Sequence, residues 1–355
     1  MKENTGDIKP LRGDFNKRDA GAGYLLAIAA LLIPQFILAF IWIIGMQGFG
    51  WRDISEIQAE SFAFLIVSSV ALQLILGLTY FFFVRTRRIE PFRAPRVKNM
   101  PARNWLLSAS AGVIALFGLM FTSFVFDIFF TGVLKYKSPD MPDFDTAGKA
   151  VLGIIFIGVF PAVFEELIFR GIILRGLAPL GKTKAVLISA AAFALAHMSP
   201  AQTVHQFLLG IVMGLIAWET GSILAPMLIH FINNALSVVL DVSGFFGLIE
   251  KMRAWEIVVA ALVTLAAVCG IMYLILRFIK KPAQDKDAQY QYAFAPDGST
   301  PAIQISSQPQ YFTPAIQPSC QRQSPVIAPK SALPHLLIGF AIAALMWIIA
   351  LALAM

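Results

Sequence analysis

Nine long apolar runs divide the chain, and most of them approach the ~20 residues that an α-helix needs to cross a bilayer. Hydrophobic residues make up 58% of the 355 residues and charged residues 14%, whereas soluble globular proteins carry about 25% charged residues. This number of charged residues is too small to cover a water-facing surface. Most apolar side chains are therefore expected to face lipid. We predict an all-α, polytopic membrane helical bundle with eight or nine transmembrane helices.

The predicted spans share a high apolar content. They cover residues 24–46, 61–84, 105–130, 147–168, 185–199, 204–218, 223–242, 257–278 and 335–355. The fifth and sixth runs are short, so they are expected to be either two spans or the two arms of a bent hairpin. Because these two runs are shorter than a full span, the predicted number of transmembrane helices is eight or nine.

Basic residues set the expected orientation, because cytoplasmic loops of membrane proteins carry an excess of Lys and Arg. With the N-terminus in the cytoplasm, four basic clusters fall on that side; they lie within residues 2–18, 85–103, 170–184 and 277–281. The net charge of +7 is therefore interpreted as a topology signal, and no nucleic-acid partner is predicted. We expect a multi-pass protein of the cell (inner or plasma) membrane.

Four regions are predicted along the chain. Residues 1–22 form a cytoplasmic arm, residues 23–281 a membrane helical domain, and residues 335–355 a final transmembrane helix. Residues 282–334 are rich in Pro, Gln, Ala and Ser, a composition that cannot bury enough apolar surface to offset the entropy of ordering. We interpret them as a disordered cytoplasmic linker, with a docking tail as the alternative.

The fourth predicted span contains charges that its apolar surroundings do not explain. Each charge near the middle of a membrane helix costs roughly 2.5–3.5 kcal/mol on insertion scales, yet Glu165, Glu166 and Arg170 occur together. Glu166 and Arg170 are four residues apart and can pair on one helix face. Glu165 then points about 100° away. These charges indicate either a functional site or a structural ion cluster.

Two further spans carry polar residues at compatible depths. His197 follows Phe193 by one helical turn in the fifth span, and His230 precedes Asn234 by one turn in the seventh. Pro161 lies four residues before Glu165, and Pro226 lies four residues before His230. Because proline cannot complete the helix ladder, kinks are expected beside both positions. Together the three spans predict one polar site.

A carboxylate beside neutral imidazoles suits the activation of water for attack on a carbonyl carbon. A second imidazole and an amide N–H could stabilise the resulting oxyanion. Alternatively, Glu165, His197 and His230 match the ligand set of a catalytic zinc ion. The chain has no HExxH motif of the zincins and no GxSxG elbow of the serine hydrolases. Peptide hydrolysis, with zinc or with no cofactor, is the leading chemistry.

At these positions the chain resembles a known family. Residues 165–170 (EELIFR) resemble an EExxxR motif, residues 193–197 (FALAH) an FxxxH motif, and residues 230–234 (HFINN) an HxxxN motif. Their order is similar to that of the CAAX prenyl protease and bacteriocin-processing (CPBP) family, also labelled type II CAAX endopeptidase-like or Abi. The resemblance covers about residues 146–242.

The resemblance implies an intramembrane endopeptidase with a site that opens toward the cytoplasm. By analogy, Glu165 and His197 activate the water, and His230 and Asn234 support the oxyanion. Glu166, Arg170 and Phe193 would be supporting residues. The family's mechanism has been interpreted both as glutamate-dependent and as metalloendopeptidase activity.

The implied substrate is a membrane-associated peptide or protein, prenylated or bacteriocin-like, with roles in bacteriocin processing or immunity. Two alternatives stay open. Intramembrane Glu and His residues also build the proton relays of proton-coupled transporters. A catalytically silent immunity or binding protein could keep the same scaffold.

Overall fold

A computed structural model describes residues 12–49, 62–136, 144–279 and 333–353. Within these residues the only β-structure is a single bridge between Arg12 and Ile89. Most of the remaining described residues are helical, which confirms the all-α prediction. The α-helices are α1 (Lys17–Phe49), α3 (Phe62–Thr86), α4 (Ala102–Gly132), α5 (Ala147–Gly153), α6 (Phe160–Glu166), α7 (Lys182–Ala196), α8 (Thr203–Thr220), α9 (Leu224–Val242), α10 (Phe245–Glu250), α11 (Ala254–Phe278) and α12 (Leu333–Leu353). Two π-helical segments, η1 (Ile154–Val159) and η2 (Leu167–Leu174), and a 3-10 turn, η3 (Ala178–Leu180), complete the elements.

Eight segments of the described residues are long and apolar enough to cross a membrane. They coincide with the predicted spans except for the fifth, because α7 has only 15 residues. Helix α7 instead packs against α8, and the approach of Gly210 to Ala190 and of Gly214 to Val186 makes the two helices antiparallel, in agreement with the expected hairpin. The chain is therefore a multi-pass membrane protein by the length and composition of its helices.

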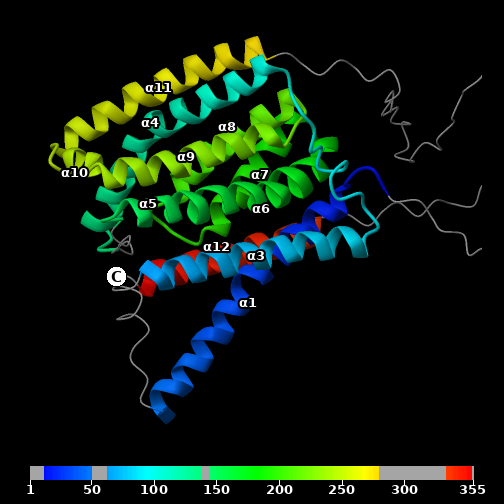
Figure 1. The fold of residues 1–355 in the computed structure, drawn as a ribbon, viewed down its shortest axis with the longest axis horizontal. Helices are drawn as coiled ribbons and strands as arrows, with labels where there is room; N and C mark the ends of the chain where they lie inside the picture. Colours follow the sequence, from blue (N-terminus) through cyan, green and yellow to red (C-terminus); the bar gives the residue numbers. More distant parts are fainter. Residues whose placement is uncertain (1–11, 50–61, 137–143, 280–332, 354–355) are drawn as a thin grey trace, which may run out of the picture. The chain divides into compact units, whose positions relative to one another are not determined.

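Helices far apart in the sequence lie side by side (Figure 1). Helix α4 packs along α11 on one side and against α9 on the other, while α12 packs against α1. Helix α1 also contacts η2. The carboxylate-bearing segment is thus enclosed by neighbouring helices, and every residue of η2 is buried.

Residues 147–174 form one helical rod in which π-helical turns flank α6. A π-turn inserts one residue into the helix ladder, and such turns are frequent at functional sites. The π-helical segment η1 ends two residues before Pro161, and the kink predicted there stays a prediction. The expected kink at Pro226 is wrong. Pro226 lies in the first turn of α9, where a missing N–H leaves no helix bond unmade.

The basic clusters meet at one end of the helices. The Arg12 N–H donates to the Arg88 carbonyl at 2.7 Å, and the Ile223 N–H donates to the Arg96 carbonyl at 3.2 Å. At the same end, the Lys182 ammonium lies 2.5 Å from the Glu219 carboxylate. The helix connections that should share one side of the membrane therefore contact one another.

The boundaries of the four predicted regions can be compared with the structure only in part. Helix α1 begins at Lys17, six residues before the predicted start of the membrane domain. The predicted linker, residues 282–334, lies outside the described residues except for its last two positions. It stays a prediction.

Candidate active site

A buried ionic network occupies the centre of the bundle. The Arg170 guanidinium donates to Oε1 of Glu166 at 2.7 Å, and Nδ1 of His230 lies 3.0 Å from the same oxygen. Glu166 is 0% exposed, Arg170 1% and His230 3%. The predicted pairing of Glu166 with Arg170 is therefore confirmed, and helix α9 contributes a third member. Because a carboxylate only accepts hydrogen bonds, Nδ1 of His230 carries the proton.

Helix α8 approaches this network closely enough to take part in it. A second guanidinium nitrogen of Arg170 donates to the Gly210 carbonyl at 3.3 Å. A Cβ atom on Gly210 would lie only 3.0 Å from the Cα of Ala190 on α7. A glycine at position 210 therefore lets α7 and α8 come together, which brings a backbone acceptor within reach of a buried cation.

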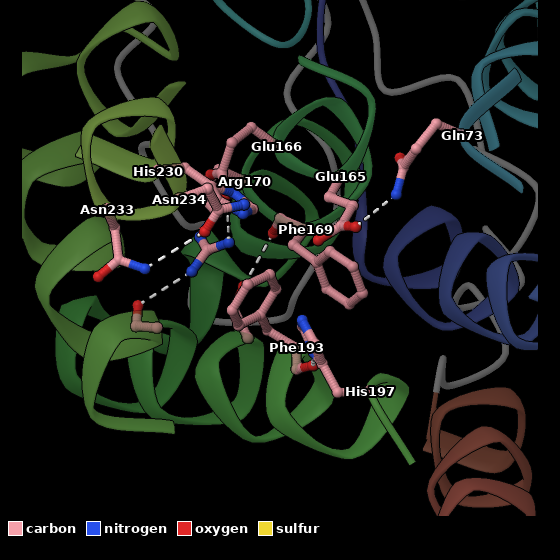
Figure 2. A network of polar contacts seen from close by, with 12 residues as sticks. Gln73, Glu165, Glu166, Phe169, Arg170, Phe193, His197, His230, Asn233 and Asn234 are labelled. Carbon is pink, nitrogen blue, oxygen red and sulfur yellow. Dashed lines mark hydrogen bonds and ion pairs between the residues drawn. The ribbon is translucent and has the colours of Figure 1, made fainter. Parts of the chain in front are cut away.

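The ring of Phe193 joins the parts of the site (Figure 2). The Arg170 guanidinium lies 4.4 Å from the ring centroid, an arrangement that gives a cation–π attraction. The rings of His197 and His230 contact Phe193 edge-on at centroid distances of 4.7 and 5.7 Å. Phe193 is fully buried. It therefore sets the separation of the two imidazoles.

Glu165 faces away from this network. Its Oε1 accepts a hydrogen bond at 2.8 Å from Nε2 of Gln73 on helix α3, while its buried Oε2 has no partner among the described residues. Figure 2 shows Glu165 and His197 on the same side of the Phe193 ring, away from Glu166 and His230. The 100° offset expected between adjacent helical residues thus separates the two carboxylates.

His197 ends helix α7. It occupies the C-cap position, and its Nδ1 lies 2.8 Å from the Phe193 carbonyl, one turn earlier. A carbonyl only accepts hydrogen bonds, so Nδ1 carries the proton and Nε2 keeps its lone pair in the neutral ring. Unlike the fully buried Phe193, the His197 side chain is partly exposed. It can therefore accept a proton or a hydrogen bond from outside the protein.

Asn234 satisfies a backbone carbonyl that Pro161 leaves without a donor. Pro161 has no N–H to donate to the carbonyl of Ile157, four residues earlier. The side-chain Nδ2 of Asn234 donates to that carbonyl at 2.9 Å, and the Asn234 oxygen accepts from Asn233 at 3.2 Å. One of its two amide N–H bonds therefore holds α9 against η1.

The structure brings the three predicted segments together but does not assemble the predicted zinc set. Among the described residues, no group of three or more His, Cys, Asp or Glu side chains is arranged to hold a metal ion. The proposed ligands Glu165, His197 and His230 are separated because Glu165 turns toward α3 and His230 bonds to Glu166. As placed, these side chains do not fit a zinc ion.

Two polar residues near the site were not predicted. Gln73 is 4% exposed in the middle of an apolar helix, and Asn233 is 5% exposed beside Asn234. An uncharged amide within a membrane span is visible in the sequence, but it costs less than a charge and is a weaker signal. Only the contact with Glu165 distinguishes Gln73 from other polar residues in the spans.

The fold and the site define a polytopic all-helical membrane protein with carboxylate, imidazole and amide groups gathered inside its bundle. Residues 147–236 match the family model described as "Type II CAAX prenyl endopeptidase Rce1-like". The match covers about a quarter of the chain and supports a relation to this family. Searches of curated proteins and of solved structures give no significant match.

Proposed function

We propose that this protein is an endopeptidase that cleaves a membrane-associated peptide with water activated by Glu165. The observation that carries the proposal is the contrast between the two adjacent carboxylates. Glu166 is fully buried, and its Oε1 is hydrogen-bonded to both Arg170 and His230. Glu165 is partly exposed, and its Oε1 accepts from the uncharged amide of Gln73 and not from a cation. A general base must not be neutralised by an ion pair and must be near the surface that admits water, and of the two carboxylates only Glu165 is partly exposed.

The reaction can be written with these groups. Oε2 of Glu165 takes one proton from water, and the water oxygen bonds to the scissile carbonyl carbon as the C=O π electrons move to oxygen. Nε2 of His197 accepts a hydrogen bond from the other O–H of the water. When the tetrahedral intermediate collapses, the C–N bond breaks and the leaving nitrogen takes the proton from Glu165.

The oxyanion would be stabilised from helix α9. In its imidazolium form, His230 donates through Nδ1 to Glu166 and through Nε2 to the oxyanion. The second N–H of Asn234 is available for the same purpose, since only one of them is bonded to Ile157. Preorganised donors of this kind typically contribute about 2.7–4 kcal/mol each to transition-state stabilisation.

The substrate would reach the site from the cytoplasm. The basic ends of the helices meet at one end of the bundle, and the positive-inside rule assigns that end to the cytoplasm. Because the matched domain is described as a CAAX prenyl endopeptidase, a peptide with a prenylated cysteine near its C-terminus is the first substrate to test. The apolar spans and the family match also lead us to propose the cell membrane as the location of the protein.

The proposal can be tested with purified protein in detergent or proteoliposomes. The probes are a peptide with a prenylated C-terminal cysteine motif and the same peptide without the lipid. We expect cleavage, and Glu165→Gln should lower kcat by about 10²–10⁴-fold. Glu219→Gln is the matched control, because Glu219 is a carboxylate outside the site that pairs with Lys182.

Full activity in Glu165→Gln would refute the assignment of the base. A preparation that cleaves neither peptide but carries protons across proteoliposomes would favour the transporter alternative. Binding of the lipidated peptide without cleavage would favour the silent binding protein.

A further inference from the structure

We propose that Gln73 of helix α3 is a positioning residue for the carboxylate of Glu165. This inference rests on the proposed function of Glu165. It adds to the site a helix that lies outside the matched domain, since that domain begins at residue 147. The contact is the 2.8 Å hydrogen bond from Nε2 of Gln73 to Oε1 of Glu165.

The burial of Gln73 supports a role beyond packing. The side chain is 4% exposed, and its own Oε1 is buried without a hydrogen-bond partner among the described residues. Burying an amide that is only half satisfied costs free energy that an apolar side chain of similar size would not. The bond to Glu165 is the compensating interaction that the structure shows for this amide.

The geometry of the bond determines what Gln73 can do. A carboxylate has two oxygens, and the amide N–H occupies one of them, Oε1. The bond restrains the torsion of the carboxylate, and with it the direction of Oε2, the oxygen assigned to take the proton. Reacting groups must be held closely for catalysis, and a misplacement of about 1 Å can cost roughly 100-fold in rate. Gln73 therefore acts through Glu165 and does not touch the substrate.

Helix α3 offers a matched control. Ser69 lies one turn before Gln73, and its hydroxyl donates to the Phe156 carbonyl of η1 at 3.5 Å. Ser69→Ala removes a contact between α3 and the 147–174 rod without touching Glu165. Gln73→Met keeps the length and shape of the side chain but removes the donor. Gln73→His returns an N–H donor at about the same reach.

The kinetic experiment measures peptide cleavage by the four full-length proteins in detergent. We expect Gln73→Met to lower kcat by about 10- to 100-fold with KM within twofold of wild type. Gln73→His should regain part of kcat, and Ser69→Ala should resemble wild type. Unfolding midpoints should agree among the variants. Equal losses in Gln73→Met and Ser69→Ala, or a loss explained by unfolding, would overturn the proposal.

A second measurement is independent of activity. The difference between the infrared spectra of wild type and Glu165→Gln, both labelled with ¹³C-carboxyl glutamate, isolates the carboxylate band of Glu165. We expect this band to shift in Gln73→Met and to stay in place in Ser69→Ala. An unshifted band would overturn the positioning role. A shifted band in a protein that cleaves no peptide would instead contradict the proposed function alone.

Discussion

Nδ1 of His230 lies 3.0 Å from Oε1 of Glu166, so the second carboxylate of the pair, and not the first, orients the imidazole of helix α9. The same oxygen accepts from Arg170 at 2.7 Å. This arrangement separates a buried network of Glu166, Arg170 and His230 from the partly exposed Glu165 and His197. The predictions below follow from that division.

Removing one partner of the buried ion pair should destabilise the fold. Glu166→Gln leaves the Arg170 charge buried without a counter-ion, and such losses cost about 3–5 kcal/mol. Arg170→Met should cost a similar amount, whereas the double variant should regain part of the stability. Unfolding in mixed detergent micelles measures all three. Strictly additive effects in the double variant would contradict the ion pair.

The bond from Asn234 to Ile157 should be coupled to Pro161. Asn234→Leu leaves a carbonyl unsatisfied and should cost about 1–3 kcal/mol of stability. In a Pro161→Ala background, the restored N–H can satisfy that carbonyl, so the same substitution should cost less. A double-mutant cycle measures the difference. The idea fails if the cost of Asn234→Leu is the same in both backgrounds.

Shortening Phe193 should affect both histidines. Phe193→Leu removes the ring that packs against His197, His230 and the Arg170 guanidinium. We expect a loss of about 1–3 kcal/mol of stability and a fall in kcat of roughly tenfold or more, since both imidazoles lose their orientation. Phe160→Leu is the control, because that ring stacks only with Phe156 and Phe164 among the described aromatic pairs. Equal kcat values for the two variants would show that Phe193 is ordinary packing.

The two ends of the 147–174 rod should lie on opposite sides of the membrane. Gly148→Cys places a thiol at an exposed position near the start of the rod, and Lys184→Cys places one at an exposed position in the first turn of α7, which follows the end of the rod. Cys269 and Cys320 are replaced by serine in both variants. A membrane-impermeant thiol reagent should label position 184 from the cytoplasmic side and position 148 from the other. Labelling of both from one side would refute the orientation.

Local chemistry was readable from the residues alone. Apolar runs of about 20 residues determine helices that span lipid, because every backbone hydrogen bond must then be made within the segment. The Glu166–Arg170 pair also follows from the helical repeat, because residues four apart share a face. The family motifs of residues 165–234 were recognisable for the same reason, since they lie at short spacings along single helices.

Contacts between helices were decided by the tertiary structure. The partner of Glu165 is a glutamine 92 positions away, and no spacing in the chain connects the two residues. The π-helical segments η1 and η2 change the helical register on both sides of α6. A regular 3.6-residue repeat therefore does not predict which face of the 147–174 rod contacts α3 and which contacts α9. The sequence by itself determined which residues are polar within lipid. Only the packing of the helices decided that Glu166 is fully buried against Arg170 and His230, while Glu165 is partly exposed and accepts from Gln73.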